Sequence, residues 1–355
     1  MTEIKTEANK HSNYVVHYAI KANANTKLLK IIHEAGLGAD CVSGGEIKAA
    51  LEAGFPASEI VYAGVGKSDW EINLGLDNEI FCFNVESIPE LEVINALASA
   101  RGKIANVAFR INPNVDAHTH AKITTGLNEN KFGLAMEDML PAIHRAQELP
   151  AVRYVGLHFH IGSQITDLEP FEQLAQRVNE LQNRLDAADI KTESINVGGG
   201  LGVDYAQPEA NPIPDFDSYF RIFKDHLQLR DGQQVHFELG RSVVAQCGAL
   251  ISRVLYVKHG HKKDFVIVDA GMSDLLRPAL YGSAHQACNL SHPEAPSARF
   301  DIVGPICESS DVFLSDYTLP SPQRGDLIAF KSAGAYGEIM ASGYNCRQLP
   351  ESWID

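Results

Sequence analysis

The stretch VVHYAIKANANTKLLKIIHEAGLGADCV, residues 15–42, contains the pattern that decides the fold. It begins with an apolar, β-branched run, continues with apolar residues at helical spacing around Leu28 and Ile32, and ends on a second apolar run. Uniformly apolar runs are typical of parallel strands that are buried on both faces. The stretch therefore predicts a strand–helix–strand unit of a parallel α/β fold.

The same unit recurs along the first two-thirds of the chain. Further strands are predicted at residues 60–63, 80–84, 106–111, 154–159, 194–197 and 235–239, after those at 15–20 and 38–42. Residues at helical spacing separate them, as in Phe171, Leu174, Val178 and Leu181. Eight repeats within about 250 residues match a (β/α)₈ barrel of the TIM type.

The pattern changes after Arg241, where predicted helices become few. Strands are expected at residues 243–257, 264–268, 300–303 and 326–330, joined by turns that contain Gly and Pro. Such a succession predicts a mainly antiparallel β domain. We therefore predict two domains, a barrel over residues 1–245 and a β domain over residues 246–355.

Composition restricts the class of partner. The 355 residues include 30 Lys+Arg and 45 Asp+Glu, and a net charge of −15 argues against nucleic acid as the partner. We find no apolar run of about 18 residues, and residues 1–13 are too polar for a secretion signal, so we expect no membrane partner. The six cysteines lack zinc-site spacing. We interpret them as reduced, mostly buried thiols of a cytoplasmic protein with a small-molecule substrate.

Polar residues at the carboxyl ends of barrel strands are the candidates for catalysis. Lys21 follows the first strand, where it could form a Schiff base with an aldehyde or be an ordinary solvated lysine. His158 and His160 end the sixth strand and point to the same side of it. Stacking on a flat cofactor ring, zinc ligation and an ordinary core position are all open for these two histidines.

The ends of strands seven and eight are the usual phosphate site of such a barrel. The glycine run 198–200 follows strand seven, and glycine lets backbone N–H groups approach an anion, although such a run can also be a simple turn. Glu238 ends strand eight, where it could hold a proton on a ring nitrogen while Gly240 and Arg241 complete an anion pocket. A surface Glu–Arg pair is the alternative.

The second domain adds two candidates. Arg277 could bind a substrate carboxylate. Cys307 could donate a proton as a thiol or could be a buried core cysteine.

Taken in order, these motifs resemble those of the fold-type III pyridoxal phosphate (PLP) enzymes, and among them the diaminopimelate decarboxylase family. The matching stretches are YAIKAN at 18–23, VSGGE at 42–46, HFHIGS at 158–163, GGG at 198–200, ELGR at 238–241, RPALY at 277–281, CES at 307–309 and GAYG at 334–337. The resemblance extends from about residue 15 to residue 347.

The resemblance implies a role for each matched residue. Lys21 would hold PLP as a Schiff base, His160 would stack on its ring and Glu238 would bind its pyridine nitrogen. The phosphate would be bound by Ser163, Gly198, Gly199, Gly200, Gly240, Arg241 and Tyr336. The substrate would be bound by Arg241, Arg277, Tyr281, Glu308 and Tyr336, with Glu308 on the distal amino group, and Cys307 would donate the proton. In the family Cys307 and Glu308 reach the active site of the partner subunit, so a homodimer is implied.

The implied reaction converts meso-2,6-diaminopimelate to L-lysine and carbon dioxide, the last step of lysine biosynthesis. Decarboxylation needs a protonated pyridine ring that withdraws electrons, and a carboxylate at Glu238 keeps that proton in place. Racemases of this fold typically have arginine there, which argues against a racemase. The motifs are also compatible with an arginine or ornithine decarboxylase and with a non-catalytic homologue that binds PLP.

Two features depart from the family pattern. Members usually have a strand and a helix before the lysine strand, whereas residues 1–13 are too polar to supply that strand. We therefore expect a shortened chain, an unpaired sheet edge in the second domain and a barrel that lacks one covering helix. Leu239 replaces the usual proline before Gly240, which should leave the turn that carries Arg241 less restrained, with a modest effect.

Overall fold

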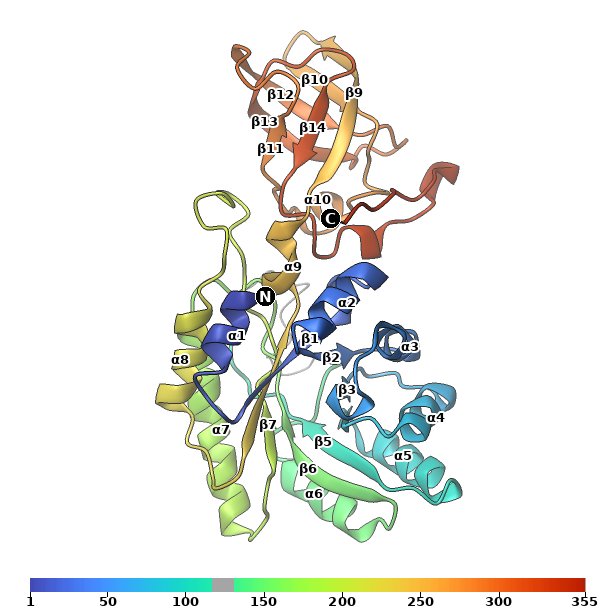
Figure 1. Cartoon of the computed structure of the whole chain (residues 1–355), viewed down its shortest axis with the longest axis vertical. Coiled ribbons are helices and arrows are strands. Elements are labelled where there is room, and N and C mark those ends of the chain that lie inside the picture. Colours follow the sequence, from blue (N-terminus) through green and yellow to red (C-terminus); the bar gives the residue numbers. More distant parts are fainter. Residues whose placement is uncertain (117–130, 355) are drawn as a thin grey trace. The chain divides into compact units, whose positions relative to one another are not determined.

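Eight parallel strands close into a barrel in the computed structural model, which describes residues 1–116 and 131–354 (Figure 1). The strands are β1 (Tyr14–Ala19), β2 (Gly38–Cys41), β3 (Ile60–Tyr62), β4 (Cys82–Val85), β5 (Ala105–Arg110), β6 (Val152–His158), β7 (Ser194–Asn196) and β8 (Gln234–Leu239). They are neighbours in chain order, and β8 pairs with β1 to close the ring. The predicted barrel is confirmed, and each predicted strand overlaps an observed one.

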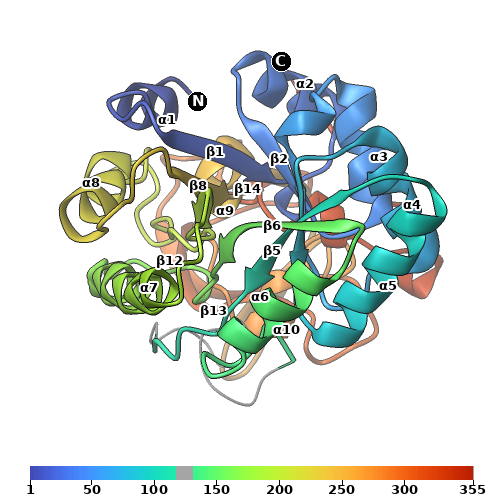
Figure 2. The same ribbon diagram turned by 90° about the horizontal axis from the view of Figure 1, so that it is seen from below.

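Helices surround the strands, as Figure 2 shows. They are α2 (Thr26–Glu34), α3 (Gly44–Ala53), α4 (Asp69–Asn78), α5 (Ile88–Ala100), α6 (Met139–Glu148), α7 (Glu169–Ala187) and α8 (Phe216–His226), with short 3₁₀ helices η1 (Ile20–Ala22) and η2 (Ala57–Glu59). Their periodic apolar residues explain their orientation, because Phe171, Leu174 and Val178 are all buried on one face of α7. The VSGGE motif begins α3, where the Ser43 hydroxyl accepts a hydrogen bond from the Glu46 N–H group.

A further helix, α1 (Thr2–Ala8), precedes β1 and lies beside α8 (Figure 2). Ile4 and Ala8, one turn apart, are buried, and Lys10 forms an ion pair with Asp217 of α8 at 3.4 Å. The expectation that the barrel lacks a covering helix is therefore wrong. Two buried apolar side chains, with the buried Glu7 between them, are enough to hold a short helix whose other residues are polar.

The second unit comprises residues 203–214 together with the chain from Arg241 onward, and residues 1–202 and 215–240 form the first. Its elements are α9 (Arg241–Val244), η3 (Ala245–Cys247), β9 (Leu250–His259), β10 (Asp264–Val268), α10 (Arg277–Tyr281), β11 (Ala287–Asn289), β12 (Ser297–Val303), β13 (Val312–Pro320), β14 (Leu327–Phe330), η4 (Glu338–Met340) and η5 (Tyr344–Cys346). The sheet order is β11-β14-β9-β10-β12-β13, and only the β10–β12 pair is parallel among the described pairs. The mainly antiparallel character is confirmed.

Details of the second unit differ from the prediction. Residues 243 and 244 lie in α9, so the strand predicted from residue 243 begins only at Leu250. Strands β11 and β13 were not predicted, and they form the two edges of the described sheet. The Tyr317 hydroxyl of β13 accepts the Ala287 N–H group of β11 and donates to the Ala287 carbonyl oxygen. The Tyr317 side chain therefore covers part of the edge that β11 forms. The segment 203–214, predicted in the barrel, groups with the second unit because Tyr205 contacts Arg241 and Glu209 pairs with Lys331.

All six cysteines are free thiols, but the prediction that most are buried is wrong. Cys41 and Cys82 are buried, whereas Cys247, Cys307 and Cys346 are exposed. Within residues 1–116 and 131–354, none of the helices combines the length and apolarity needed to span a bilayer.

Candidate active site

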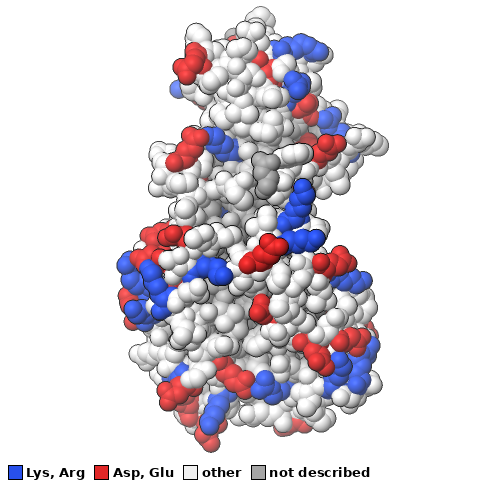
Figure 3. Space-filling view, viewed as in Figure 1, with Lys and Arg blue, Asp and Glu red and all other residues white. Residues whose placement is uncertain are grey.

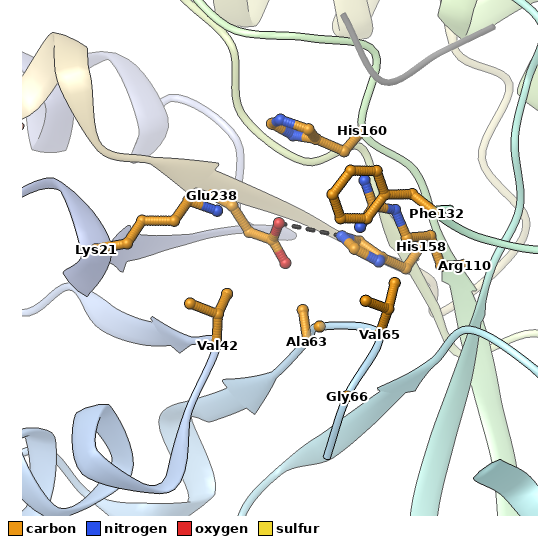
Figure 4. Close-up of a pocket in the computed structure, with 11 residues that line it drawn as sticks. Lys21, Val42, Ala63, Val65, Gly66, Arg110, Phe132, His158, His160 and Glu238 are labelled. Carbon is orange, nitrogen blue, oxygen red and sulfur yellow. Dashed lines mark hydrogen bonds and ion pairs between the residues drawn. The ribbon is translucent and has the colours of Figure 1, made fainter. Parts of the chain in front are cut away.

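Lys21 lies in a cavity of about 390 Å³ at the carboxyl end of the barrel, because η1 follows β1 directly. The cavity is also lined by Val42, Ala63, Gly64, Val65, Gly66, Arg110, Phe132, His158, His160 and Glu238. Figure 4 shows the Lys21 side chain extending toward the Glu238 carboxylate. A primary amine and a carboxylate therefore share one cavity of a size suited to a small cofactor.

Glu238 is buried at the end of β8 and accepts three hydrogen bonds from barrel side chains. The donors are His158 Nε2 at 3.1 Å, Asn196 Nδ2 at 2.8 Å and Asn84 Nδ2 at 3.3 Å. Burial alone would raise the pKa of Glu238, but the hydrogen bond and charge of His158, together with the charges of Lys21 and His160, place the pKa below its usual value. Glu238 is therefore an ionised carboxylate inside the barrel, and the alternative of a surface pair with Arg241 is wrong.

His160 also lines the cavity and forms a hydrogen bond with the glycine run, residues 198–200. Its Nδ1 accepts the Gly199 N–H group at 3.3 Å, and burial together with the Lys21 charge lowers the pKa of His160 well below its usual value. The ring is therefore neutral. Figure 4 shows it facing a cavity whose other wall includes the apolar side chains of Val42 and Val65, an arrangement that suits a flat ring. In the described part of the chain no three His, Cys, Asp or Glu residues are grouped to hold a metal ion.

Close packing explains why glycine occupies residues 198–200. A Cβ on Gly199 would lie 1.9 Å from the carbonyl oxygen of Glu238, and Gly200 has a φ of +112°. Larger residues are excluded there, so this backbone lies directly against the end of β8. Gly198 is the first residue of the run, Gly240 follows β8, and Ser163 is half-buried in the segment after β6.

Two buried arginines lie among tyrosines in the second unit. Arg241 Nη1 donates to the Tyr205 hydroxyl at 2.7 Å, and the Arg241 guanidinium lies 4.9 Å from the Tyr336 ring centre. The Arg277 guanidinium lies 5.5 Å from the ring centre of Tyr281 and 5.7 Å from that of Tyr336. Burial and the neighbouring Arg241 charge lower the pKa of Arg277. An anionic ligand would stabilise the two buried positive charges, so this cluster can bind a carboxylate or phosphate.

Cys307 and Glu308 lie in the exposed loop between β12 and β13. The alternative of a buried core position for Cys307 is therefore wrong. The Cys307 N–H donates to Asn345 Oδ1 at 3.1 Å, and the Tyr344 hydroxyl donates to Glu308 Oε1 at 2.5 Å. A thiol and a carboxylate are thus presented together on one loop.

The first-unit cavity fits a planar aldehyde cofactor with an aromatic nitrogen, since it combines an amine, an ionised carboxylate and a neutral imidazole. The sequence pattern of the family described as "Pyridoxal-dependent decarboxylase, pyridoxal binding domain" matches residues 2–245. The chain belongs to the pyridoxal-dependent decarboxylase family. It is a carboxy-lyase, and its cofactor is pyridoxal phosphate.

Individual members of the decarboxylase family resemble this chain along most of its length. The diaminopimelate decarboxylase of Bacteroides thetaiotaomicron is 64% identical over 353 residues, covering 99% of this chain and 91% of the relative. That of Zymomonas mobilis is 43% identical, covering 94% of this chain and 79% of the relative. The crystal structure of the Helicobacter pylori enzyme complexed with L-lysine has a TM-score of 0.92 at 41% identity, covering 98% and 87% of the two chains. A viral arginine decarboxylase, at 21% identity and a TM-score of 0.85, shares the fold alone.

The structure places the predicted residues of this decarboxylase in three groups. The barrel cavity contains Lys21, His160 and Glu238, with the glycine loop behind His160. The arginine–tyrosine cluster contains Arg241, Arg277, Tyr281 and Tyr336. The exposed loop contains Cys307 and Glu308.

Sequence reasoning missed Asp40, which lies next to Lys21. Asp40 Oδ2 is 3.7 Å from Lys21 Nζ, and both carboxyl oxygens are buried without a hydrogen-bond partner among the described residues. Burial, followed by the Glu238 charge, raises the pKa of Asp40 well above its usual value. A lone acidic residue inside the apolar run 38–42 was the available signal.

Three further polar residues of the site were also missed. Asn84 and Asn196 bind Glu238 from strand ends, where polar residues in buried strands could have been noticed. Tyr205 follows the glycine run, and no local pattern distinguishes it from an ordinary loop residue.

Proposed function

We propose that this chain decarboxylates meso-2,6-diaminopimelate to L-lysine and carbon dioxide. The observation that carries the proposal is that Lys21 and the ionised Glu238 share one barrel cavity. The 64% identical relative is named a diaminopimelate decarboxylase, and the Helicobacter pylori relative was crystallised with L-lysine. Both names agree with the expected substrate and product.

Bound PLP supplies a ring that accepts the electron pair left when the C–C bond to the carboxyl group breaks. We assign its attachment to the Lys21 amine, and Glu238 is the carboxylate that keeps a proton on the pyridine nitrogen. His160, which also lines the cavity, would stack on the ring. The reaction consumes one proton, which Cα receives in place of carbon dioxide.

The remaining predicted residues are assigned to two anionic groups, the phosphate of the cofactor and a carboxylate of the substrate. Ser163, the glycine run 198–200, Gly240, Arg241 and Tyr336 would bind the cofactor phosphate through N–H, hydroxyl and guanidinium donors. The buried Arg277 binds a substrate carboxylate, together with Tyr281. An arginine is well suited to this task because its planar donors match a carboxylate.

Cys307 supplies the proton to Cα, and the Glu308 carboxylate binds the distal ammonium group of the substrate. Both residues are exposed in the single chain, in agreement with a homodimer in which each subunit completes the active site of the other. The six free thiols fit a reducing compartment, and we place the enzyme in the cytoplasm.

The proposal is tested by carbon dioxide release from the purified PLP-loaded chain. We expect turnover of meso-diaminopimelate with equimolar L-lysine, and rates at least about a hundredfold lower with arginine or ornithine, since a site built to pair specific polar groups rejects analogues that lack them. Preferred turnover of arginine or ornithine, a racemised product, or no turnover with PLP bound would each overturn the assignment.

Replacement of Lys21 tests the attachment of the cofactor. The Lys21→Ala variant should lose both activity and the absorbance band that develops when the wild-type chain binds PLP, because it lacks the amine. Lys262→Ala, at an exposed position of the second unit, is the matched control and should keep both. A normal band in Lys21→Ala would contradict the role of this lysine.

A further inference from the structure

Two exposed loops of the second unit are joined by two hydrogen bonds. One loop carries Cys307 and Glu308, and the other carries Tyr344 and Asn345. The Tyr344 hydroxyl donates to Glu308 Oε1 at 2.5 Å, and Asn345 Oδ1 accepts the Cys307 N–H group at 3.1 Å. All four residues are exposed. Hydrogen bonds between exposed groups add little to the free energy of folding, so stability alone is a weak reason for this pairing.

Buried groups hold the Cys307 loop in place. Asp311 is only 3% exposed, and its carboxylate accepts the N–H groups of Ile306 at 2.7 Å and of Met272 at 2.6 Å. The Asp311 N–H group in turn donates to the Glu308 carbonyl oxygen at 3.1 Å. The backbone on both sides of the thiol and carboxylate is therefore restrained.

The second loop is anchored at both ends. The Ser342 N–H group donates to the Ser273 carbonyl oxygen at 2.9 Å, and Arg347 Nη2 donates to the Asp269 carbonyl oxygen at 2.5 Å. Between these anchors Asn345 and Cys346 have φ values of +54° and +58°. Two consecutive non-glycine residues in the left-handed region are strained, and such strain is found where a site needs a defined geometry.

From these contacts we propose that Tyr344 and Asn345 are positioning residues for the decarboxylation. Tyr344 orients the Glu308 carboxylate for the distal ammonium group of the substrate, and Asn345 holds the Cys307 backbone so that its thiol reaches Cα. In that step the S–H bond breaks, the proton moves to Cα, and the thiolate regains a proton from water. The inference rests on the proposed function, from which the roles of Cys307 and Glu308 are taken.

The Tyr344 role is tested with Tyr344→Phe in the PLP-loaded enzyme. This variant keeps the ring and loses the hydroxyl that donates to a charged acceptor, so KM for meso-diaminopimelate should rise about tenfold while kcat stays within about twofold. The dissociation constant of L-lysine, measured by calorimetry, should rise by a similar factor, because the product keeps the distal amino group. Tyr256→Phe, at an exposed tyrosine on β9, is the matched control and should leave all three values unchanged.

The Asn345 role is tested with two variants at one position. Asn345→Gly adopts the left-handed backbone without strain but lacks the side-chain oxygen, whereas Asn345→Asp keeps an acceptor oxygen there. We expect kcat of Asn345→Gly to fall about tenfold with KM and L-lysine affinity unchanged, and its solvent deuterium isotope effect on kcat to increase, because proton delivery becomes slower. Asn345→Asp should restore kcat to within about threefold of the wild type.

The outcomes separate this inference from the proposed function. If the wild type is active and neither Tyr344→Phe nor Asn345→Gly changes kcat, KM or L-lysine affinity, the positioning roles are overturned and the proposed function is not. A loss of kcat and L-lysine affinity together with a lower melting temperature in both variants indicates a structural role and also overturns them. A wild-type holoenzyme that releases no carbon dioxide from meso-diaminopimelate overturns the proposed function, and the two positioning roles with it.

Discussion

Glu238 and Asp40 are both buried carboxyl groups near Lys21, yet their pKa values are shifted in opposite directions. Glu238 receives hydrogen bonds from His158, Asn84 and Asn196, whereas the Asp40 oxygens accept none from described residues. Donors stabilise a carboxylate, and burial without them stabilises the neutral acid. The sequence places Glu238 at the end of a predicted strand and Asp40 inside another, but the difference depends on donors to Glu238 from β4, β6 and β7, which only the folded barrel brings together.

The Glu238 carboxylate should be essential for turnover. Glu238→Gln keeps the shape and an acceptor oxygen but cannot ionise, so it cannot hold the proton on the pyridine nitrogen. We expect kcat for carbon dioxide release to fall by about a hundredfold or more. Glu193→Gln, at an exposed residue paired with Arg153, is the control. A kcat within about threefold of the wild type would remove Glu238 from the mechanism.

Asp40 should make stability depend on pH. As pH rises above the usual pKa of aspartate, the unfolded chain releases this proton while the folded chain, with its raised pKa, retains it, so stability falls with increasing pH. Asp40→Asn has no proton to release. Its free energy of unfolding relative to the wild type should therefore increase between about pH 5 and pH 8, measured by urea denaturation of the PLP-free chains. The exposed Asp231→Asn is the control, and a pH-independent difference for Asp40→Asn would contradict its assigned neutral form.

At the scale of elements, short apolar runs of four to six residues, several of them uniformly apolar, predicted all eight barrel strands, because most residues of these strands are buried. The same rule failed at residues 243 and 244, which are β-branched and nevertheless helical in α9. It also missed β13, where exposed Ser315 and Asp316 interrupt the apolar alternation and Asp316 has a φ of +50°. Partly exposed strands with irregular register carry a weaker periodic signal than buried ones.

The contact between the glycine loop and β8 gives a test at this scale. In Gly199→Ala the new methyl group would lie 1.9 Å from the Glu238 carbonyl oxygen, so the loop or the strand must move. We expect the free energy of unfolding to fall by about 2 kcal/mol or more, and PLP affinity to weaken. Gly45→Ala, at an exposed position in α3, should be neutral or slightly stabilising, since alanine favours helix. Unchanged stability and PLP affinity in Gly199→Ala would show that the loop does not need this close approach.

At the scale of the whole molecule, acidic and basic side chains alternate over the face drawn in Figure 3, without a broad basic area on that face. Such a surface offers no attraction to a polyanion, in agreement with a small-molecule substrate.

The proposed homodimer can be tested by mixing two inactive variants. Lys21→Ala supplies an intact Cys307, and Cys307→Ala supplies an intact Lys21. If each site combines Lys21 of one subunit with Cys307 of the other, random mixing makes half of the dimers mixed, each with one complete site, and restores about a quarter of wild-type activity. Native mass spectrometry should show the mixed dimer. A mixed dimer without activity would indicate that both residues act within one chain.

The sequence by itself determined the (β/α)₈ barrel, the antiparallel second domain and the strand-end positions of Lys21, His160 and Glu238, because burial and strand-end placement are local patterns. The tertiary structure decided what those patterns leave open. The pKa of Asp40 is raised and that of Glu238 is lowered, the Tyr205 hydroxyl accepts a hydrogen bond from Arg241, and Asn345 and Tyr344 form hydrogen bonds with Cys307 and Glu308. Each of these facts depends on partners distant in sequence, since the energy of a buried charge or a hydrogen bond is set by the groups that the fold brings within a few ångströms.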